Sequence, residues 1–177
     1  MKTIETERLI IRPMKEKDAP KLLELLSKPR VNCFVSEKIE TLEEALEHIN
    51  SSNPEYDFAV CTKDDELAGI LFGGLEDEPG DTFSPCWNFL GSASGKGYCT
   101  EAARAYFDYL FNEKNIRRLY AYTEIDNLPS QNVCKKLGMR HEGTFKDFIS
   151  FVNNPDGTPK YETTMQFAIL KSEWNRE

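Results

Sequence analysis

Histidine and closely spaced cysteine pairs are scarce in this chain. Its 177 residues include two histidines, His48 and His141, and five cysteines with no Cys-x-x-Cys spacing. Structural zinc sites draw on closely spaced cysteine and histidine pairs, so the sequence predicts no metal site. An odd number of scattered cysteines also argues against a disulfide framework and favours the reducing cytoplasm.

Long apolar runs and an excess of positive charge are also missing. No apolar run approaches the roughly 18 residues of a membrane-spanning helix, and Glu5 and Glu7 interrupt any apolar core of a signal peptide. The 22 Lys and Arg residues are outnumbered by 30 Asp and Glu residues, for a formal net charge of −8. Nucleic acids and anionic membranes bind basic patches, so we expect a cytoplasmic protein without either partner.

The remaining composition is that of a globular protein. Hydrophobic residues make up 40% of the chain and charged residues 29%. A chain of this length corresponds to one domain, and neither a repeat nor a low-complexity linker divides it. We therefore expect a single domain over residues 1–177.

Hydrophobic periodicity predicts a mixed α+β domain with a central, largely antiparallel sheet. Asp18 is expected to cap the first helix, which should end before Pro29, and Thr41 with Glu44 has capping-box spacing for the second. Residues 30–40 show no period and are predicted to be a loop. The other expected helices are 97–114 and 129–137, and the expected strands are 3–14, 57–62, 67–75, 82–90, 117–125, 139–152 and 161–170.

A glycine-rich loop lies between a predicted strand and a predicted helix, in the sequence Leu-Gly-Ser-Ala-Ser-Gly-Lys-Gly-Tyr that begins at Leu90. Glycines allow close backbone approach, and the free N–H groups of a first helical turn attract anions, so a phosphate or pyrophosphate site is predicted. A Walker A loop would need glycine at Leu90 and Ser or Thr at Gly97. A dinucleotide fingerprint would need glycine at Thr100. Both alternatives are therefore disfavoured.

Gly95-x-Gly97, with Tyr98 and the Thr-Glu-Ala that begins at Thr100, resembles the acyl-CoA loop of the GNAT superfamily of N-acetyltransferases. A second segment, from Asp126 to Met139, is similar to the N-x-x-S…K-x-G-[FM] segment of the branch that includes ribosomal-protein N-terminal acetyltransferases. Residues 5–13, the Glu142-Gly143 pair and residues 170–174 also resemble that branch. The ordered segments together extend over nearly the whole chain.

The resemblance implies the GNAT fold, a mixed, mostly antiparallel sheet with helices on both faces. Two adjacent parallel strands, 82–90 and 117–125, would splay apart to admit the pantetheine arm of acetyl-CoA, and the pyrophosphate would rest on the amides of residues 94–100. Asn127 would steady the pantetheine, and Ser130 would lie near the thioester sulfur. The residues implied for acetyl-CoA binding are Phe89, Leu90, Ser94, Gly95, Lys96, Gly97, Tyr98, Cys99, Thr100, Asn127 and Ser130.

Two departures from the family pattern bear on the chemistry. Ser92 stands where the loop commonly has Gln, Arg or Glu, although binding there uses mainly backbone N–H groups. Cys134 stands where many members have a tyrosine acid, so the resemblance leaves Ser130 as the proton donor to the departing thiolate. The catalytic base is left open, with Glu76, Glu142 and Asp147 as candidates acting through a water.

The sequence thus predicts an acetyl-CoA-dependent N-acetyltransferase that acts on a primary amine. An α-amine has a pKa of about 7.7–8.0, against about 10.4 for lysine, so it needs less help from a base. The absence of an obvious base therefore favours an α-amine or a small amine as acceptor. The alternative is a non-enzymatic acyl-CoA-binding module, and a nucleotide hydrolase is a third possibility. Family analogy places the acceptor groove at residues 30–40 and 153–159 and suggests a homodimer.

Overall fold

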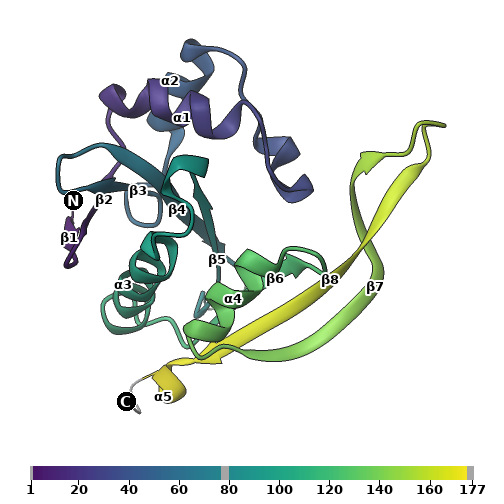
Figure 1. Cartoon of the computed structure of the whole chain (residues 1–177). Helices are drawn as coiled ribbons and strands as arrows, with labels where there is room; N and C mark the ends of the chain where they lie inside the picture. The colour runs from purple at the N-terminus through teal and green to yellow at the C-terminus, as the bar shows by residue number, and fades with distance from the viewer. Residues whose placement is uncertain (1, 77–79, 175–177) are drawn as a thin grey trace.

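A computed structural model describes residues 2–76 and 80–174 (Figure 1). Its centre is one eight-stranded sheet in the order β1-β2-β3-β4-β5-β6-β8-β7. Among the described residues only β5 and β6 run parallel, so the predicted mixed, mostly antiparallel sheet is confirmed. The strands are β1 (Ile4–Glu5), β2 (Leu9–Pro13), β3 (Phe58–Thr62), β4 (Leu67–Leu75), β5 (Thr82–Phe89), β6 (Arg118–Glu124), β7 (Arg140–Asn153) and β8 (Pro159–Leu170).

Helices cover both faces of this sheet, as predicted (Figure 1). Successive residues of a strand point to opposite faces, so Val60 of β3 packs in the core under α3 while Cys61 packs in the core under α1 and α2. The helices are α1 (Ala19–Leu26), α2 (Leu42–Ser51), α3 (Tyr98–Asn112), α4 (Leu128–Lys136) and α5 (Lys171–Trp174), with short 3₁₀ turns η1 (Glu16–Asp18), η2 (Asn32–Glu37) and η3 (Gly91–Ala93). Within the described residues, no helix is long and apolar enough to cross a membrane.

The first predicted strand, residues 3–14, is two strands joined by a tight turn. The Thr6 N–H donates to the Leu9 carbonyl at 3.0 Å, and the Leu9 N–H donates to the Thr6 hydroxyl at 3.0 Å. This reciprocal closure folds Ile4 back onto Ile11. The single-strand prediction was wrong because a threonine side chain, rather than a Gly or Pro signal, makes the turn.

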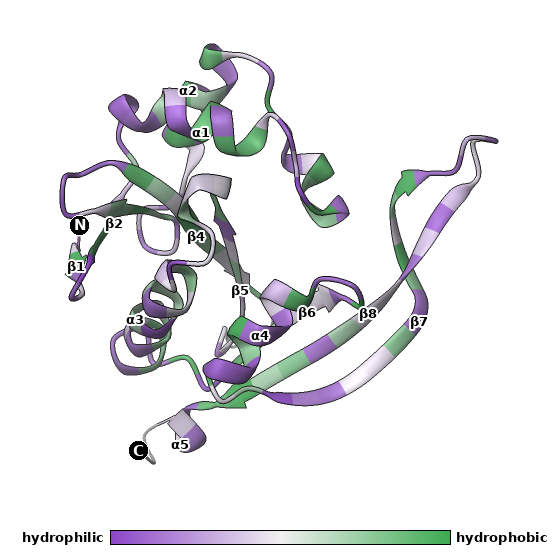
Figure 2. Cartoon of the chain, in the orientation of Figure 1, coloured by the Kyte–Doolittle hydropathy of each residue, from purple (hydrophilic) through white to green (hydrophobic). Residues whose placement is uncertain are grey.

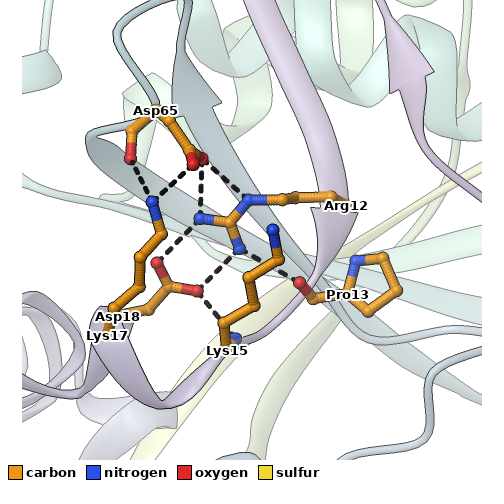
Figure 3. A network of polar contacts seen from close by, with 6 residues as sticks. All are labelled: Arg12, Pro13, Lys15, Lys17, Asp18 and Asp65. Atoms are coloured by element: carbon orange, nitrogen blue, oxygen red, sulfur yellow. Dashed lines mark hydrogen bonds and ion pairs between the residues drawn. The ribbon is translucent and has the colours of Figure 1, made fainter.

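The capping predictions had different outcomes. Thr41 and Glu44 form the expected capping box, with the Glu44 N–H donating to the Thr41 hydroxyl at 3.1 Å. Asp18 occupies the N-cap position of α1, but its side chain makes no capping hydrogen bond. It instead accepts two hydrogen bonds from the guanidinium of Arg12 in β2, in a network that also contains Asp65 (Figure 3).

Residues 30–40, predicted to be a loop, contain the 3₁₀ turn η2. Such a turn closes on i→i+3 bonds and needs no apolar periodicity, so the sequence pattern does not show it. It is held from outside, because the Cys33 N–H donates to the Glu124 carboxylate at the end of β6, at 3.2 Å. The η2 turn therefore lies beside the carboxyl end of β6.

Strands β7 and β8 form a long hairpin that projects from the body of the protein (Figure 1), with hydrophobic and hydrophilic residues mixed along it (Figure 2). The register runs from Phe145 opposite Thr164 to Ile149 opposite Glu162, so β7 has two more residues than β8 across this interval. Asp147, with φ of 47°, lies in this bulge. Bulges bend a strand and redirect its side chains, which matters for the face discussed below.

Candidate functional site

The strands β5 and β6 separate toward their carboxyl ends. They pair only at Thr82 with Arg118 and at Phe83 with Leu119, although β5 continues to Phe89 and β6 to Glu124. The split therefore lies between the two strands for which the family resemblance implied it. Backbone edges facing each other across such a gap can bond to an extended ligand that enters between them.

Of the two residues expected to offer backbone groups to this ligand, only Phe89 faces the split. The Leu90 N–H donates to the Ala68 carbonyl of β4 at 2.9 Å, and the Leu90 carbonyl accepts from Ala93. Because alternate residues of an antiparallel pair direct their backbone groups to opposite sides, Phe89 directs its own toward β6. The expectation for the Leu90 backbone is corrected accordingly.

The glycine loop ends in the first turn of α3. Gly95 and Gly97 have φ of 75° and 79°, and Gly97 is the N-cap residue. The first backbone bond of the helix is Glu101 N–H to Gly97 carbonyl, so the amides of residues 98–100 have no acceptor within α3. Free amides at a helix N-terminus are suited to bind an anion.

Three basic side chains surround this loop in a chain of net negative charge. Arg30 donates to the Ser94 hydroxyl at 3.1 Å, and the Lys96 ammonium lies 5.9 Å from the centre of the Tyr98 ring. The Arg8 guanidinium lies 5.0 Å from that ring. A local positive field at a helix N-terminus adds to its attraction for phosphate groups.

Arg8 also attaches the loop to the β1–β2 turn. It donates to the Lys96 carbonyl at 2.8 Å and to the Glu101 carboxylate at 2.7 Å, and Glu101 accepts from the Thr6 hydroxyl as well. Partial burial favours the protonated acid, but the bonds from Thr6 and Arg8 lower the pKa of Glu101 below its ordinary value. The ionised carboxylate thus fixes the start of α3.

Asn127 and Ser130 lie at the start of α4, beside the open end of the split. The Asn127 side-chain oxygen accepts the Ser130 N–H at 3.3 Å, which caps α4. The indole N–H of Trp87, from β5, donates to the Ser130 hydroxyl at 3.4 Å. Ser130, on the helix that follows β6, therefore contacts β5 beside the open end of the split.

A residue that the sequence did not single out, Glu124, completes this arrangement. Its side chain is only 7% exposed at the carboxyl end of β6, and its carboxylate accepts from the Cys33 N–H and from the Asn127 amide, both at 3.2 Å. Its backbone carbonyl accepts from Gln131 of α4. The feature of the sequence that could have identified Glu124 is its position, because it is the acidic residue near the end of a predicted strand that lines the split.

The three carboxylates considered from the sequence lie elsewhere. Glu142 is paired with Arg118 and Arg140. Glu76 lies near Tyr120 at the closed end of the split, where burial and the adjacent carboxylate raise the pKa of that phenol. The third, Asp147, lies in the β7 bulge. None of the three is hydrogen-bonded to Asn127 or Ser130 in the described part of the chain.

The thiols near the site are structural. Cys134 is fully buried in the core, and burial raises its pKa to about 12. Cys99 packs against the same core, and burial likewise raises its pKa to about 12. In residues 2–76 and 80–174, no group of three or more His, Cys, Asp or Glu side chains is placed to hold a metal.

Comparisons with known proteins agree with this geometry. The family described as acetyltransferase (GNAT) domain matches residues 8–140. An uncharacterised N-acetyltransferase of Bacillus subtilis, YnaD, is 34% identical over 97% of this chain and 99% of its own. A GNAT-family acetyltransferase structure from Bacillus anthracis has 31% identity and a TM-score of 0.84, covering 97% of this chain and all of that one. A spermidine N-acetyltransferase variant from Vibrio cholerae shares the fold, with a TM-score of 0.76 at 16% identity and coverage of 97% and 98%.

Proposed function

The chain belongs to the GNAT family of acetyltransferases, and from this premise we propose that it transfers the acetyl group of acetyl-CoA to a primary amine. The observation that carries the proposal is the split between β5 and β6. It has an anion-binding glycine loop at one side and the linked groups Glu124, Asn127 and Ser130 at its open end.

The residues around the split fit an acyl-CoA thioester. Amides 98–100 with Arg8 and Lys96 would hold the pyrophosphate, and the Phe89 backbone would bond to the pantetheine arm. The Thr123 hydroxyl, on β6, is buried without a hydrogen-bond partner among the described residues, so a polar group of a ligand has an unused partner there.

Glu124 and Ser130 would divide the proton transfers. Glu124 takes one proton from the ammonium group, directly or through a water, and the neutral nitrogen attacks the thioester carbonyl carbon. As the C–S bond breaks, Ser130 passes its proton to the sulfur and takes up the second proton of the nitrogen, directly or through a water, so that an amide and the free thiol are formed and the hydroxyl is restored. Asn127, bonded to both residues, fixes their separation.

Acetyl-CoA is expected to bind with a saturable calorimetric signal. ATP and NAD, used as controls, are expected not to bind. Gly95→Ala should weaken this binding by about tenfold or more, because a Cβ at this φ of 75° would project from the loop that receives the phosphates. Gly157→Ala is the matched control: its φ is 86°, its Cβ position is equally open, and it lies in the β7–β8 turn. Equal affinity for the two variants would contradict the assigned loop.

Ser130→Ala separates an enzyme from a binding module. We expect kcat to fall by about 10- to 100-fold, because the departing sulfur loses its proton donor, while acetyl-CoA affinity stays within about threefold. Thiol release and calorimetry on the same preparation measure the two quantities. A protein that binds acetyl-CoA but acetylates no amine before or after the substitution is the non-enzymatic module.

The acceptor that we propose is an α-amine or a small amine. An α-amine needs little assistance from a carboxylate base to become neutral, whereas an alkyl amine such as the lysine side chain needs roughly 3.5 kcal/mol more. The Vibrio cholerae structure is named for spermidine, a small amine handled on this fold. We place the reaction in the cytoplasm, where the five unpaired cysteines stay reduced.

A further inference from the structure

Three aromatic side chains form an exposed cluster next to Glu124, which we call the aromatic strip: Tyr122, Phe145 and Phe148. Their ring centres lie 5.2–6.2 Å from one another, and the rings are 37–48% exposed. Large apolar groups gathered on a surface mark interaction sites more often than single ones do.

The strip shares a sheet face with the proposed base. Tyr122 precedes Glu124 by two residues on β6, and Glu124 and Phe145 are both register partners of Thr164 in β8. Residues two apart on a strand, and direct partners across strands, project from the same face. The bulge in β7 brings Phe148 against Tyr122, with ring centres 5.6 Å apart.

The same face has two carboxylates beside the strip. Glu124 lies at one end of the strip, and Glu162, two residues from Thr164, accepts a hydrogen bond from Asn32 of η2. Carboxylates beside aromatic rings attract a protonated amine, and they disfavour an acceptor with a carboxylate near its amine. The charge of the face thus complements a cation with an apolar substituent.

The openness of the face indicates an extended acceptor. Small ligands bind in concave sites that cover most of their surface, whereas these rings lie open along strands that continue into the projecting hairpin (Figure 1). A polypeptide end can place its amine at Glu124 and its first side chain along the rings.

We propose that the acceptor is the α-amine of a polypeptide whose first residue is apolar, and that Tyr122, Phe145 and Phe148 determine this specificity. The inference rests on the proposed acetyl transfer and narrows its acceptor. The acetyl group forms an amide with the terminal nitrogen, and the rings bind the adjacent side chain without entering the reaction.

The test uses hexapeptides X-Ala-Gly-Ser-Ala-Gly with X as Phe, Leu, Gly or Asp, together with spermidine and phenylethylamine, in a thiol-release assay with the full chain. We expect kcat/KM for the Phe and Leu peptides to exceed that for the Gly peptide by about tenfold or more, since burying part of one ring accounts for such a factor. The Asp peptide should be the poorest substrate.

Phe148→Ala should remove this preference, lowering kcat/KM for the Phe peptide by about tenfold and that for the Gly peptide by less than twofold. Tyr161→Ala is the matched control, because Tyr161 is also an exposed ring of the hairpin, 57% exposed, and its neighbour Glu162 is the residue on the strip's face. It should change neither value.

The outcomes separate the two proposals. Equal rates for the Phe and Gly peptides, or a Phe148→Ala effect of the same size on both, would overturn the role of the strip while acetyl transfer stands. Acetylation of spermidine or phenylethylamine but of no peptide would overturn the polypeptide acceptor. Failure to acetylate any amine would overturn the proposed function, and the inference with it.

Discussion

We expect Glu124→Gln to lower kcat/KM for a peptide α-amine at pH 7 by roughly 100- to 10,000-fold, the range typical of the loss of a general base. The amine is mostly protonated at this pH, because its pKa is about 7.7–8.0, and an amide cannot accept its proton. Acetyl-CoA affinity should stay within about threefold, since the hydrogen bonds of Glu124 go to Cys33, Asn127 and Gln131 and not to the glycine loop. Thiol-release kinetics and calorimetry measure the two effects.

The pH profile distinguishes a base from a structural carboxylate. As the pH rises from 7 to 9.5, more of the amine becomes neutral without assistance, so the gap between Glu124→Gln and the unaltered protein should narrow. A gap that stays constant over this range would indicate misfolding or misplacement of the site. Glu142→Gln is the control, because Glu142 is paired with Arg118 and Arg140 and should leave kcat/KM within about threefold.

Arg12→Met lowers the free energy of unfolding by about 3–5 kcal/mol, the usual consequence of leaving a buried charge without its partner. The side chains of Arg12 and Asp18 are 4% and 3% exposed, and two bonds of 2.7 and 2.8 Å join them (Figure 3). Urea unfolding measures the loss. Lys17→Met is the control, since the exposed Lys17–Asp65 pair should contribute no more than about 1 kcal/mol.

A double substitution tests whether the unpaired charge is the cause. Arg12→Met with Asp18→Asn should be more stable than Arg12→Met alone, because the amide still accepts the Lys15 N–H but carries no charge. Acid weakens the same network. Hydrogen bonds from Lys17 and then Arg12 lower the pKa of Asp65 to about 2, so its contribution is complete above about pH 4 and disappears as the pH falls toward 2.

The elements of this fold were predictable where a local pattern determines them. Thr41 with Glu44 specifies the start of α2 by itself, and the glycines of residues 95–97 specify the turn into α3. Asp18 has the right residue type for a cap, but a guanidinium 6 positions earlier competes for its carboxylate. That competition depends on how β2 packs beside α1, which no local pattern contains.

The proposed catalytic arrangement was predictable only in part, for the same reason. Asn127 and Ser130 belong to a spacing that a sequence displays, whereas Glu124 is one acidic residue in an alternating strand. Its importance comes from the end of pairing between β5 and β6, and from the η2 turn that reaches it through Cys33. The aromatic strip likewise depends on a bulge that changes the register of β7.

In the described residues, β5 pairs with β6 at only two positions, Thr82 with Arg118 and Phe83 with Leu119. The sheet therefore consists of two halves, β1 to β5 and β6 to β7 by way of β8, that are paired to each other at one end only. A thioester arm bonded to both free edges would act as a missing ninth strand. Acetyl-CoA at 100 times its Kd would then raise the free energy of unfolding by about 2.7 kcal/mol. The folded state would therefore be more stable in the presence of acetyl-CoA than without it.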